Sequence, residues 1–383
     1  MNRSTSQRRK FDLQEWRRHL VASVMRRWLR STEATLRRDG TLDVSRVRRV
    51  MISRPNHRLG NALLLTPLVT ELGRLLPRAR VDLVVGGDDG SEVFREFANV
   101  QAVHCLSRRV LRHPLALLRM VSRLRRAHYD LTIDPCEASQ SGRALLVLAR
   151  APQAIGLPRS GAHGDPGNAG LERGAPAHMA KLPVFLLRNA ISGDARPDGA
   201  YPSLDIALTD KERNTARGEL DARLQGAAHP RLILGVFTRA TGSKRLDRDW
   251  WSRFTALVQR EIADLAVVEI VPPGGASSFA DRFPVYASPS VRKVAALISR
   301  LDCFVCADCG VMHLACASGT MTVGLFSTTD PARYAPYGNA SRAVDVREAT
   351  AEQVAADVIG AIRDRCATPV RNADPASMAL PRQ

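Results

Sequence analysis

Short apolar runs alternate with longer amphipathic segments along most of the chain. In the first half, apolar runs at 47–53, 81–87 and 130–134 predict strands, and segments at 61–77 and 141–151 predict helices. The second half repeats this rhythm, with strands predicted at 231–237, 266–273, 302–307 and 322–326 and helices at 247–262, 291–300 and 311–318. Strands that alternate with helices form parallel sheets covered on both faces. The pattern therefore predicts two α/β halves.

Segments rich in glycine and proline interrupt this pattern. Residues 157–178 predict a long irregular loop, and residues 192–205 predict the linker between the halves. We expect two facing Rossmann-like domains with parallel sheets, at 46–205 and 206–366, which bind ligands in the crevice at the carboxyl ends of their strands. A disordered tail is predicted at 367–383.

The segment before the first domain, residues 1–45, is basic and amphipathic. Residues 1–50 hold fourteen Lys and Arg against five Asp and Glu, so an eighth of the chain carries half of the net charge of +18. A helix over 12–30 with tryptophans on one face and arginines on the others suits an anionic membrane surface. The alternative is that its apolar stripe packs on the protein body. A second basic and apolar stretch, 107–130, favours the membrane.

Other bulk features predict the cytoplasm as the default compartment. No apolar run reaches the roughly 18 residues that a bilayer crossing needs, and the N-terminus lacks the apolar core of a secretory signal. Seven irregularly spaced cysteines in 383 residues predict reduced thiols. The positive charge would also suit nucleic acid, but no nucleic-acid-binding module is recognisable, so we expect no such partner.

The segment CADCGVMHLACASG, residues 306–319, follows a predicted strand and holds several metal-ligand residue types. Cys303, Cys306 and Cys309 have the spacing of a metal-ligand run. However, Cys303 and Cys306 lie an odd number of residues apart in a predicted strand, so they point to opposite faces and cannot share an ion. Cys316 lies in an apolar helical segment, where cysteine behaves as a small hydrophobe. We therefore expect no metal and no cofactor.

The same segment has the layout of an anion site. The predicted strand leads through Asp308, Cys309 and Gly310 into a helix, whose first N–H groups suit a phosphate. Asp308 can cap this helix or bond its first backbone N–H groups, and Gly310 lets a ligand approach the backbone. The ring of His313 leans back toward the loop. The alternative is a capped turn with a surface histidine.

Four segments together resemble glycosyltransferase family 9, the bacterial heptosyltransferases of the lipopolysaccharide inner core. DCGVMHLACASGTMTVGLFSTTDPARYAPYG, from Asp308, is similar to the family's D-[ST]-G-x-x-H-L-A-A segment. RPNHRLGNALLLTPLVTELGRLLPRARVDLVV, from Arg54, is similar to its N-terminal motif. YDLTIDPCEASQSGRALLVLARAPQAIGLPR and GVFTRATGSKRLDRDWWSRF resemble its internal landmarks in the same order. The similarity covers about residues 46–345.

The resemblance implies an inverting GT-B enzyme with no obligatory metal. It implies that the N-terminal domain binds the acceptor and the C-terminal domain binds a nucleotide-sugar donor, which in the family is usually ADP-heptose. Lys244 is one of only five lysines, and the resemblance places it where it would neutralise the leaving diphosphate. The donor-binding residues that the resemblance implies are Thr238, Lys244, Asp308, Cys309, Gly310, Val311, Met312 and His313.

The chain departs from the family at the position of the catalytic base. The family's aspartate corresponds here to Asn61, and an amide can orient a hydroxyl but cannot accept its proton. The catalytic candidates are therefore Asn61, His57 and Lys244, with Asp134 and Glu137 as alternative bases.

Two further departures concern the donor domain. The family's acidic residue after two glycines has no counterpart, since this chain offers Ser277 and Ser278 there. Cys309 replaces the usual serine or threonine.

The leading hypothesis is a glycosyltransferase that moves a sugar, a heptose by preference, from a nucleotide-diphosphate donor to a lipopolysaccharide-core or other lipid-linked glycan acceptor at the inner membrane. The alternative is a catalytically impaired member that serves as a nucleotide- or glycan-binding scaffold, because the base position is Asn61.

Overall fold

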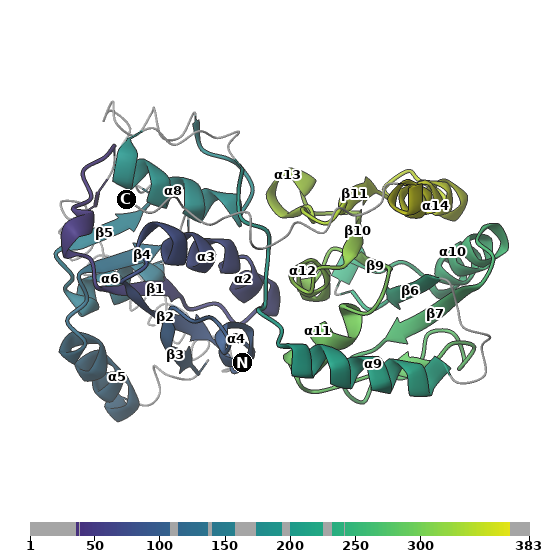
Figure 1. The fold of residues 1–383 in the computed structure, drawn as a ribbon, viewed down its shortest axis with the longest axis horizontal. Helices are drawn as coiled ribbons and strands as arrows, with labels where there is room; N and C mark the ends of the chain where they lie inside the picture. The colour runs from purple at the N-terminus through teal and green to yellow at the C-terminus, as the bar shows by residue number, and fades with distance from the viewer. Residues whose placement is uncertain are drawn as a thin grey trace, which may run out of the picture. The chain divides into compact units, whose positions relative to one another are not determined.

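The fold consists of two compact α/β units (Figure 1). The first comprises Met1–Thr209 and Ala332–Tyr334, and the second comprises Asp210–Pro331 and Ala335–Gln383. Each unit holds one parallel sheet, so the predicted pair of α/β halves is confirmed. The computed structural model describes residues 36–37, 39–107, 114–136, 140–157, 174–193, 200–224, 232–240 and 242–367. The predicted helix at 12–30, most of the predicted loop at 157–178 and the tail from 368 lie outside the described residues.

The sheet of the first unit has five strands in the order β3-β2-β1-β4-β5. They are β1 (Arg49–Arg54), β2 (Arg80–Gly86), β3 (Val100–Leu106), β4 (Leu131–Asp134) and β5 (Gln153–Gly156). Ile52 on the central strand pairs with Leu83 on one side and Ile133 on the other, and all three are fully buried. The apolar middle of the sheet is therefore covered on both faces, as a parallel sheet requires.

Helices cover both faces of this sheet. On one face α5 (Pro114–Arg126) and α6 (Gln140–Ala149) pack over a core that includes Met51, Val84 and Leu145. The other helices are α2 (Leu59–Leu63), α3 (Thr66–Leu75), α4 (Asp89–Phe94) and α8 (Lys181–Ser192), and the short η1 (Val44–Arg46) precedes β1. The single helix predicted at 61–77 is wrong, because α2 ends at Leu63 and α3 begins at Thr66. Pro67 in the first turn of α3 has no N–H to donate to the preceding turn.

The chain just before β1 lies along one edge of the first unit. The Arg37 N–H donates to the Ala154 carbonyl of β5 at 2.7 Å, and Leu36 forms an isolated parallel bridge with the same residue. The Leu42 N–H donates to the Ala190 carbonyl of α8 at 2.9 Å. This segment is thus part of the folded unit.

The sheet of the second unit has six strands in the order β11-β10-β9-β6-β7-β8. They are β6 (Leu232–Phe237), β7 (Leu265–Ile270), β8 (Val285–Tyr286), β9 (Cys303–Ala307), β10 (Met321–Phe326) and β11 (Arg342–Asp345). On one face α10 (Arg248–Glu261) and α14 (Ala351–Ala367) pack over a core that includes Val236, Trp251 and Val358. The opposite face carries α9 (Asp210–Leu224), α11 (Val291–Ile298) and α12 (Gly310–Ala317) (Figure 1). Two short helices complete the fold, η3 (Gly242–Lys244) and α13 (Pro331–Tyr334).

Membrane-spanning character is absent from the described helices. None of them combines the length and the apolarity that a bilayer crossing requires.

Candidate functional site

The predicted donor residues of the second unit gather at the carboxyl ends of β6 and β9. These strands are neighbours in the sheet, and Phe237 pairs with Cys306 where both strands end. Thr238 follows directly after β6, and Asp308 follows directly after β9. Because parallel strands end at the same edge of a sheet, residues about 70 positions apart in sequence meet here.

Lys244 and Asp308 form an ion pair at this edge. The Lys244 Nζ donates to Asp308 Oδ2 at 2.5 Å, and the Thr329 hydroxyl donates to the same oxygen. The Asp308 side chain is 7% exposed and that of Lys244 is 26% exposed, so the carboxylate is buried and the ammonium is partly exposed to water. A lysine ammonium has three N–H groups, so one bond to Asp308 leaves two for a ligand. The structure thus brings two predicted site residues together.

The expectation that Asp308 caps α12 is wrong. The N-cap residue is Cys309, which has extended backbone geometry and makes no side-chain capping hydrogen bond. Asp308 precedes the N-cap, and its Oδ2 accepts hydrogen bonds from Lys244 and Thr329 instead. No side chain makes a geometrically well-formed capping hydrogen bond at the start of α12, although the nearby N–H groups of Met312 and Val311 help to lower the pKa of the Cys309 thiol. A helix N-terminus whose N–H groups lack a strong side-chain acceptor attracts an anion.

The remaining predicted residues of α12 are buried. His313 is 4% exposed, so the alternative of a surface histidine is wrong. The Met312 side chain is fully buried, and its N–H donates to the Cys309 carbonyl at 3.2 Å. An anion at this helix start would therefore meet backbone amides rather than the Met312 side chain.

The cysteines beside the helix start interact with each other. A hydrogen bond with the Cys306 thiol lowers the pKa of Cys309, and burial raises the pKa of Cys306 well above its usual value. Burial also raises the pKa of Cys316 to about 11. Within the described part of the chain, no three His, Cys, Asp or Glu side chains form a group suited to a metal ion.

Glu269 is a buried acid that is not among the predicted site residues. It lies near the carboxyl end of β7 and is fully buried. Its carboxylate accepts hydrogen bonds from the Ser277 hydroxyl at 2.7 Å, the Ser278 N–H at 2.9 Å and the Thr238 hydroxyl at 3.5 Å. The Thr238 and Ser278 hydroxyls also share a hydrogen bond of 2.6 Å. Ser277 and Ser278, which stand where the family has an acidic residue, are thus both hydrogen-bonded to Glu269 of β7. The signal in the sequence was a glutamate within the apolar run LAVVEIV.

In the first unit, Arg54 links the end of β1 to Asn61. The guanidinium of Arg54, on a 5%-exposed residue, donates to Asn61 Oδ1 at 2.8 Å and to Cys136 Sγ at 3.1 Å. Because a guanidinium only donates, the amide oxygen of Asn61 faces Arg54 and the amide nitrogen is left for other partners. No pattern in the sequence marks Arg54 as a functional residue.

Of the candidate bases, His57 and Asp134 lie in very different surroundings. His57 is half-buried in the loop between β1 and α2, and a Cβ added at Gly87 would lie 3.6 Å from its Nδ1. Asp134 ends β4 and is 1% exposed. Glu137 lies outside the described residues. A ligand in solution can therefore reach His57 more readily than Asp134.

The Asp134 carboxyl is enclosed by its own protein partners. Its Oδ2 lies 3.7 Å from the Arg143 Nε, and its Oδ1 accepts from the Cys136 N–H at 3.2 Å. Burial raises the pKa of Asp134 to about 6, although the charges of Arg143 and Arg54 oppose this rise. The pKa suits proton transfer near neutral pH, but the position does not allow direct contact with a substrate.

Two sequence comparisons match part of this chain to known glycosyltransferases. The sequence model of glycosyltransferase family 9 (heptosyltransferase) matches residues 280–361, which include the whole of α12. The lipopolysaccharide core heptosyltransferase OpsX of Haemophilus influenzae is 36% identical over 64 residues. That match spans 17% of this chain and about a fifth of the relative, 18% of its length.

Solved structures match most of the chain. A glycosyltransferase family 9 protein from Veillonella parvula has a TM-score of 0.66 at 15% identity, covering 83% of this chain and 97% of that one. E. coli ADP-heptose lipopolysaccharide heptosyltransferase II has a TM-score of 0.61 at 15% identity, with coverage of 83% and 99%. E. coli heptosyltransferase WaaC has a TM-score of 0.58 at 18% identity, with coverage of 82% and 99%. The fold is therefore GT-B, and the resemblance of this chain to the glycosyltransferases of family 9 is confirmed.

Proposed function

We propose that the chain is an inverting glycosyltransferase that moves a heptose from a nucleotide-diphosphate donor to a lipopolysaccharide-core or other lipid-linked glycan. The observation that carries this proposal is the meeting of Lys244, Asp308 and the uncapped start of α12 at one edge of the second sheet. The relatives support the choice of donor, because WaaC was solved with ADP and with ADP-2-deoxy-2-fluoro heptose.

On the donor side, the diphosphate of an ADP-heptose-like donor would lie against the N–H groups of Gly310 and Val311. Lys244 would supply a positive charge to the departing phosphate, and Asp308 would hold the ammonium in position. Such groups act most strongly where negative charge develops as the glycosidic bond to phosphate breaks.

On the acceptor side, we assign the base to His57 and the orientation of the hydroxyl to Asn61. The Asn61 amide nitrogen would donate to the acceptor oxygen, because the amide oxygen is occupied by Arg54. The hydroxyl proton is then free to point toward a base, and His57 is the more exposed of the two described candidates. The oxygen would attack the anomeric carbon in line with the leaving diphosphate, which inverts the configuration.

The proposed location is the inner face of the cytoplasmic membrane, where lipid-linked acceptors are found. The surplus of nine positive charges within residues 1–50 supports an anionic membrane surface as a partner. The alternative function is a nucleotide- or glycan-binding scaffold, and the observation in its favour is that Arg54 faces an uncharged amide at Asn61.

The experiment compares transfer of radiolabelled heptose from ADP-heptose to a core glycolipid with equilibrium binding of ADP. We expect Lys244→Ala to weaken ADP binding about tenfold or more, because it removes hydrogen bonds to a charged group. His57→Gln should leave ADP binding unchanged and lower kcat by about 10² to 10⁴.

The matched control is Lys211→Ala, which removes the same charge from the exposed surface of α9. If Lys244→Ala and Lys211→Ala weaken ADP binding equally, the donor site is wrongly placed. Tight ADP binding with no sugar transfer by the wild-type chain would favour the scaffold.

A further inference from the structure

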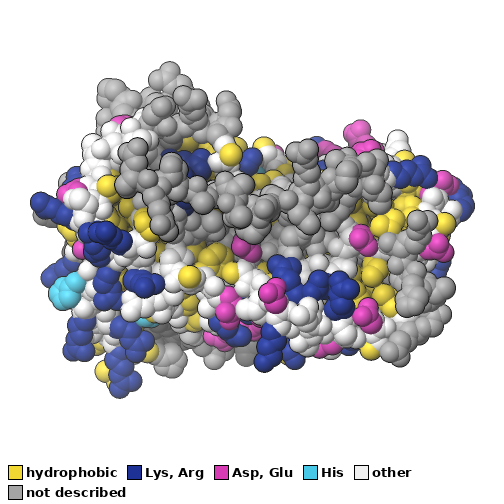
Figure 2. Space-filling model, viewed as in Figure 1, with side chains coloured by type: hydrophobic (Ala, Val, Ile, Leu, Met, Phe, Trp, Pro, Cys, Tyr) yellow, Lys and Arg dark blue, Asp and Glu magenta, His cyan; other side chains and the backbone are white. Residues whose placement is uncertain are grey.

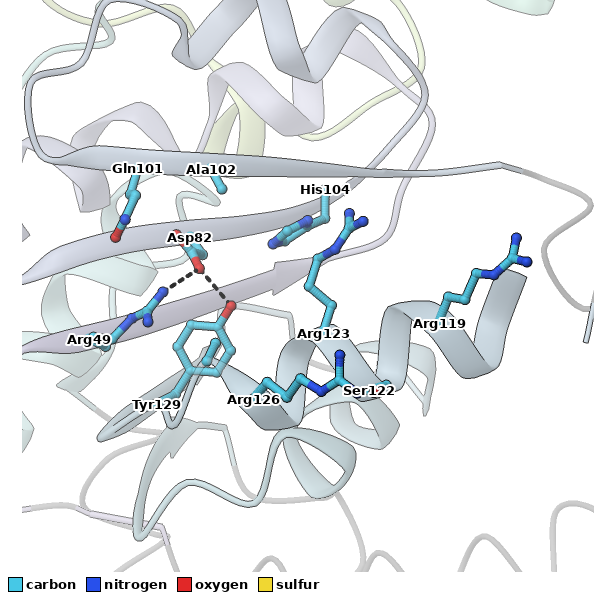
Figure 3. A pocket seen from close by; sticks show the side chains of 11 residues that line it. Arg49, Asp82, Gln101, Ala102, His104, Arg119, Ser122, Arg123, Arg126 and Tyr129 are labelled. Carbon is cyan, nitrogen blue, oxygen red and sulfur yellow. Dashed lines mark hydrogen bonds and ion pairs between the residues drawn. The ribbon is translucent and has the colours of Figure 1, made fainter. Parts of the chain in front are cut away.

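A basic groove lies on the α5 face of the first unit, apart from the sites described above. Its cavity has a volume of about 620 Å³ and is bounded by α5 on one side and by residues of β1, β2 and β3 on the other (Figure 3). Arg49, Asp82, His104 and Tyr129 line it, together with three arginines of α5. The proposed sugar transfer uses none of these residues.

The groove begins beside Arg49, at the amino end of β1, and extends over β2 to His104 on β3, whereas the candidate acceptor site lies at the carboxyl end of β1. Arg49 is the first residue of β1 and Arg54 is the last. With a rise of about 3.3 Å per residue, the two ends of this strand are roughly 17 Å apart. A molecule in the groove therefore occupies a separate site.

The charges in the groove are unbalanced toward positive. Arg119, Arg123 and Arg126 follow one another along a single side of α5 and are exposed. Within the part of the chain that the structure describes, none of the three has a hydrogen-bonding or ion-pair partner. Figure 3 shows Arg123 directed from the helix toward His104 on β3. Three guanidinium groups beside one cavity favour a phosphate, which accepts several charge-assisted hydrogen bonds at once.

Asp82, the acid in the groove, already has hydrogen-bonding and ionic partners. Asp82 is 4% exposed, and its Oδ2 accepts a hydrogen bond from the Tyr129 hydroxyl at 2.7 Å and lies 3.5 Å from the Arg49 guanidinium (Figure 3). Its single negative charge offsets Arg49 and leaves the three arginines of α5 without a counter-ion. Burial lowers the pKa of His104, and the charge of Arg123 lowers it further, although Asp82 opposes the shift. An anionic ligand would supply the missing negative charge.

Two leucines next to the arginines indicate where such a ligand would come from. Leu115 and Leu118 are 67% and 63% exposed, the largest exposed fractions among the large apolar side chains of the described residues. They precede Arg119 and Ser122 by four residues each, so they continue the same side of α5 by one helical turn. Figure 2 shows Lys and Arg side chains gathered at the lower left, where Figure 1 places α5. Apolar side chains beside a cationic patch are the combination that binds an anionic bilayer surface.

We propose that this groove binds the phosphate of an anionic lipid headgroup, with Leu115 and Leu118 entering the apolar layer of the same leaflet. The inference rests on the membrane location in the proposed function and adds to it a defined binding site on the described part of the chain. It is independent of the sugar-transfer step, which is measured separately.

The main experiment measures binding of the full chain to vesicles of phosphatidylglycerol and phosphatidylcholine by co-sedimentation. We expect the triple variant Arg119→Gln, Arg123→Gln and Arg126→Gln to bind about tenfold or more weakly than the wild type. The matched control is the triple variant Arg78→Gln, Arg95→Gln and Arg217→Gln, which removes the same charge from exposed positions elsewhere and should lose less than about threefold. Equal losses in the two variants would overturn the proposal.

A second pair of measurements separates a lipid headgroup from a soluble phosphate. The double variant Leu115→Ser and Leu118→Ser should weaken vesicle binding while leaving the binding of glycerol 3-phosphate unchanged. Binding of glycerol 3-phosphate is followed by the imidazole NMR signal of His104, assigned with His104→Gln. Two results together would show that the ligand is a soluble phosphate ester and not a lipid: vesicle binding that does not depend on the leucines, and a His104 signal that responds to glycerol 3-phosphate.

The outcomes also distinguish this inference from the proposed function. If the wild-type chain does not bind anionic vesicles, both the membrane location and the lipid site are overturned. The proposed sugar transfer, measured in detergent, would not be affected by that result. A wild-type chain that binds vesicles, with no specific loss in the α5 arginine variant, would overturn the groove alone.

Discussion

Arg54 shows how one buried side chain limits what its neighbours can do. Its guanidinium donates hydrogen bonds to the amide oxygen of Asn61 and to the Cys136 sulfur. It also places a positive charge near Asp134. An aspartate at position 61 would be an ion-pair partner for Arg54, whereas asparagine gives only a neutral hydrogen bond. The chemistry at the end of β1 therefore depends on Arg54 as much as on the residue that faces the ligand.

The raised pKa of Asp134 predicts a pH-dependent stability. Its folded pKa of about 6 exceeds the unfolded value of about 3.9, so the native state binds more protons between these values. The free energy of unfolding should therefore fall as pH rises from about 4 to about 6. Relative to Asp134→Asn, which does not titrate, the wild type should lose about 2 kcal/mol between pH 4 and pH 7.

This difference can be measured by urea unfolding of both proteins at the two pH values. Asp281→Asn, at an exposed position, is the control for the replacement of an aspartate by asparagine. A difference between the wild type and Asp134→Asn that does not change with pH would contradict the prediction.

Single site residues were predictable from the sequence where a family motif marks them. They were not predictable where a charged residue is buried inside an apolar strand. Lys244 and Asp308 were both predicted from the resemblance, and the structure joins them across 64 positions of sequence. Arg54 and Glu269 were missed because each lies in a buried apolar strand, where a charged residue looks like an exception to the pattern. Only the three-dimensional arrangement shows which polar groups satisfy them.

At the scale of elements, the sequence predicted best the segments that the fold buries. The central strands of both sheets were predicted within a few residues, because their apolar runs are continuous. The edge strand β3 was missed because its residues are mostly half-buried and its pattern mixes polar and apolar positions. The long helix α9 was missed because only Ala216 and Leu220 of its side chains are buried. Such elements take their structure from their neighbours rather than from their own pattern.

The uncapped start of α12 gives a prediction at the same scale. Cys309→Ser places a better capping residue at the N-cap, so its hydroxyl can accept from the N–H groups of the first turn. We expect the free energy of unfolding to rise by about 1 kcal/mol. The measurement is urea unfolding at pH 7.

The matched control is Cys316→Ser, which introduces a hydroxyl at a buried position inside the same helix and should lower stability. A loss of stability in Cys309→Ser would show that the Cys306 contact matters more than the cap.

At the scale of the whole molecule, the repeat of the strand and helix rhythm was sufficient to predict two α/β halves, and the family resemblance supplied the GT-B fold. The order of strands within each sheet was not predictable, because it depends on which crossovers pack on which face. The carboxyl edge of the second sheet was predictable as a site because loops from separate strands must meet there. The groove beside α5 was not, because it depends on how one helix packs against residues of three strands.

The bridge between Leu36 and Ala154 has a consequence for shortened forms of the chain. β5 is the last strand of its sheet, and the segment from Leu36 to Leu42 covers its outer edge with two largely buried leucines. A chain that begins at Leu36 should stay monodisperse in size-exclusion chromatography with light scattering. A chain that begins at Arg46 would present an open β-edge and an apolar strip, and we expect it to self-associate. Equal behaviour of the two shortened chains would mean that the edge is protected by other means.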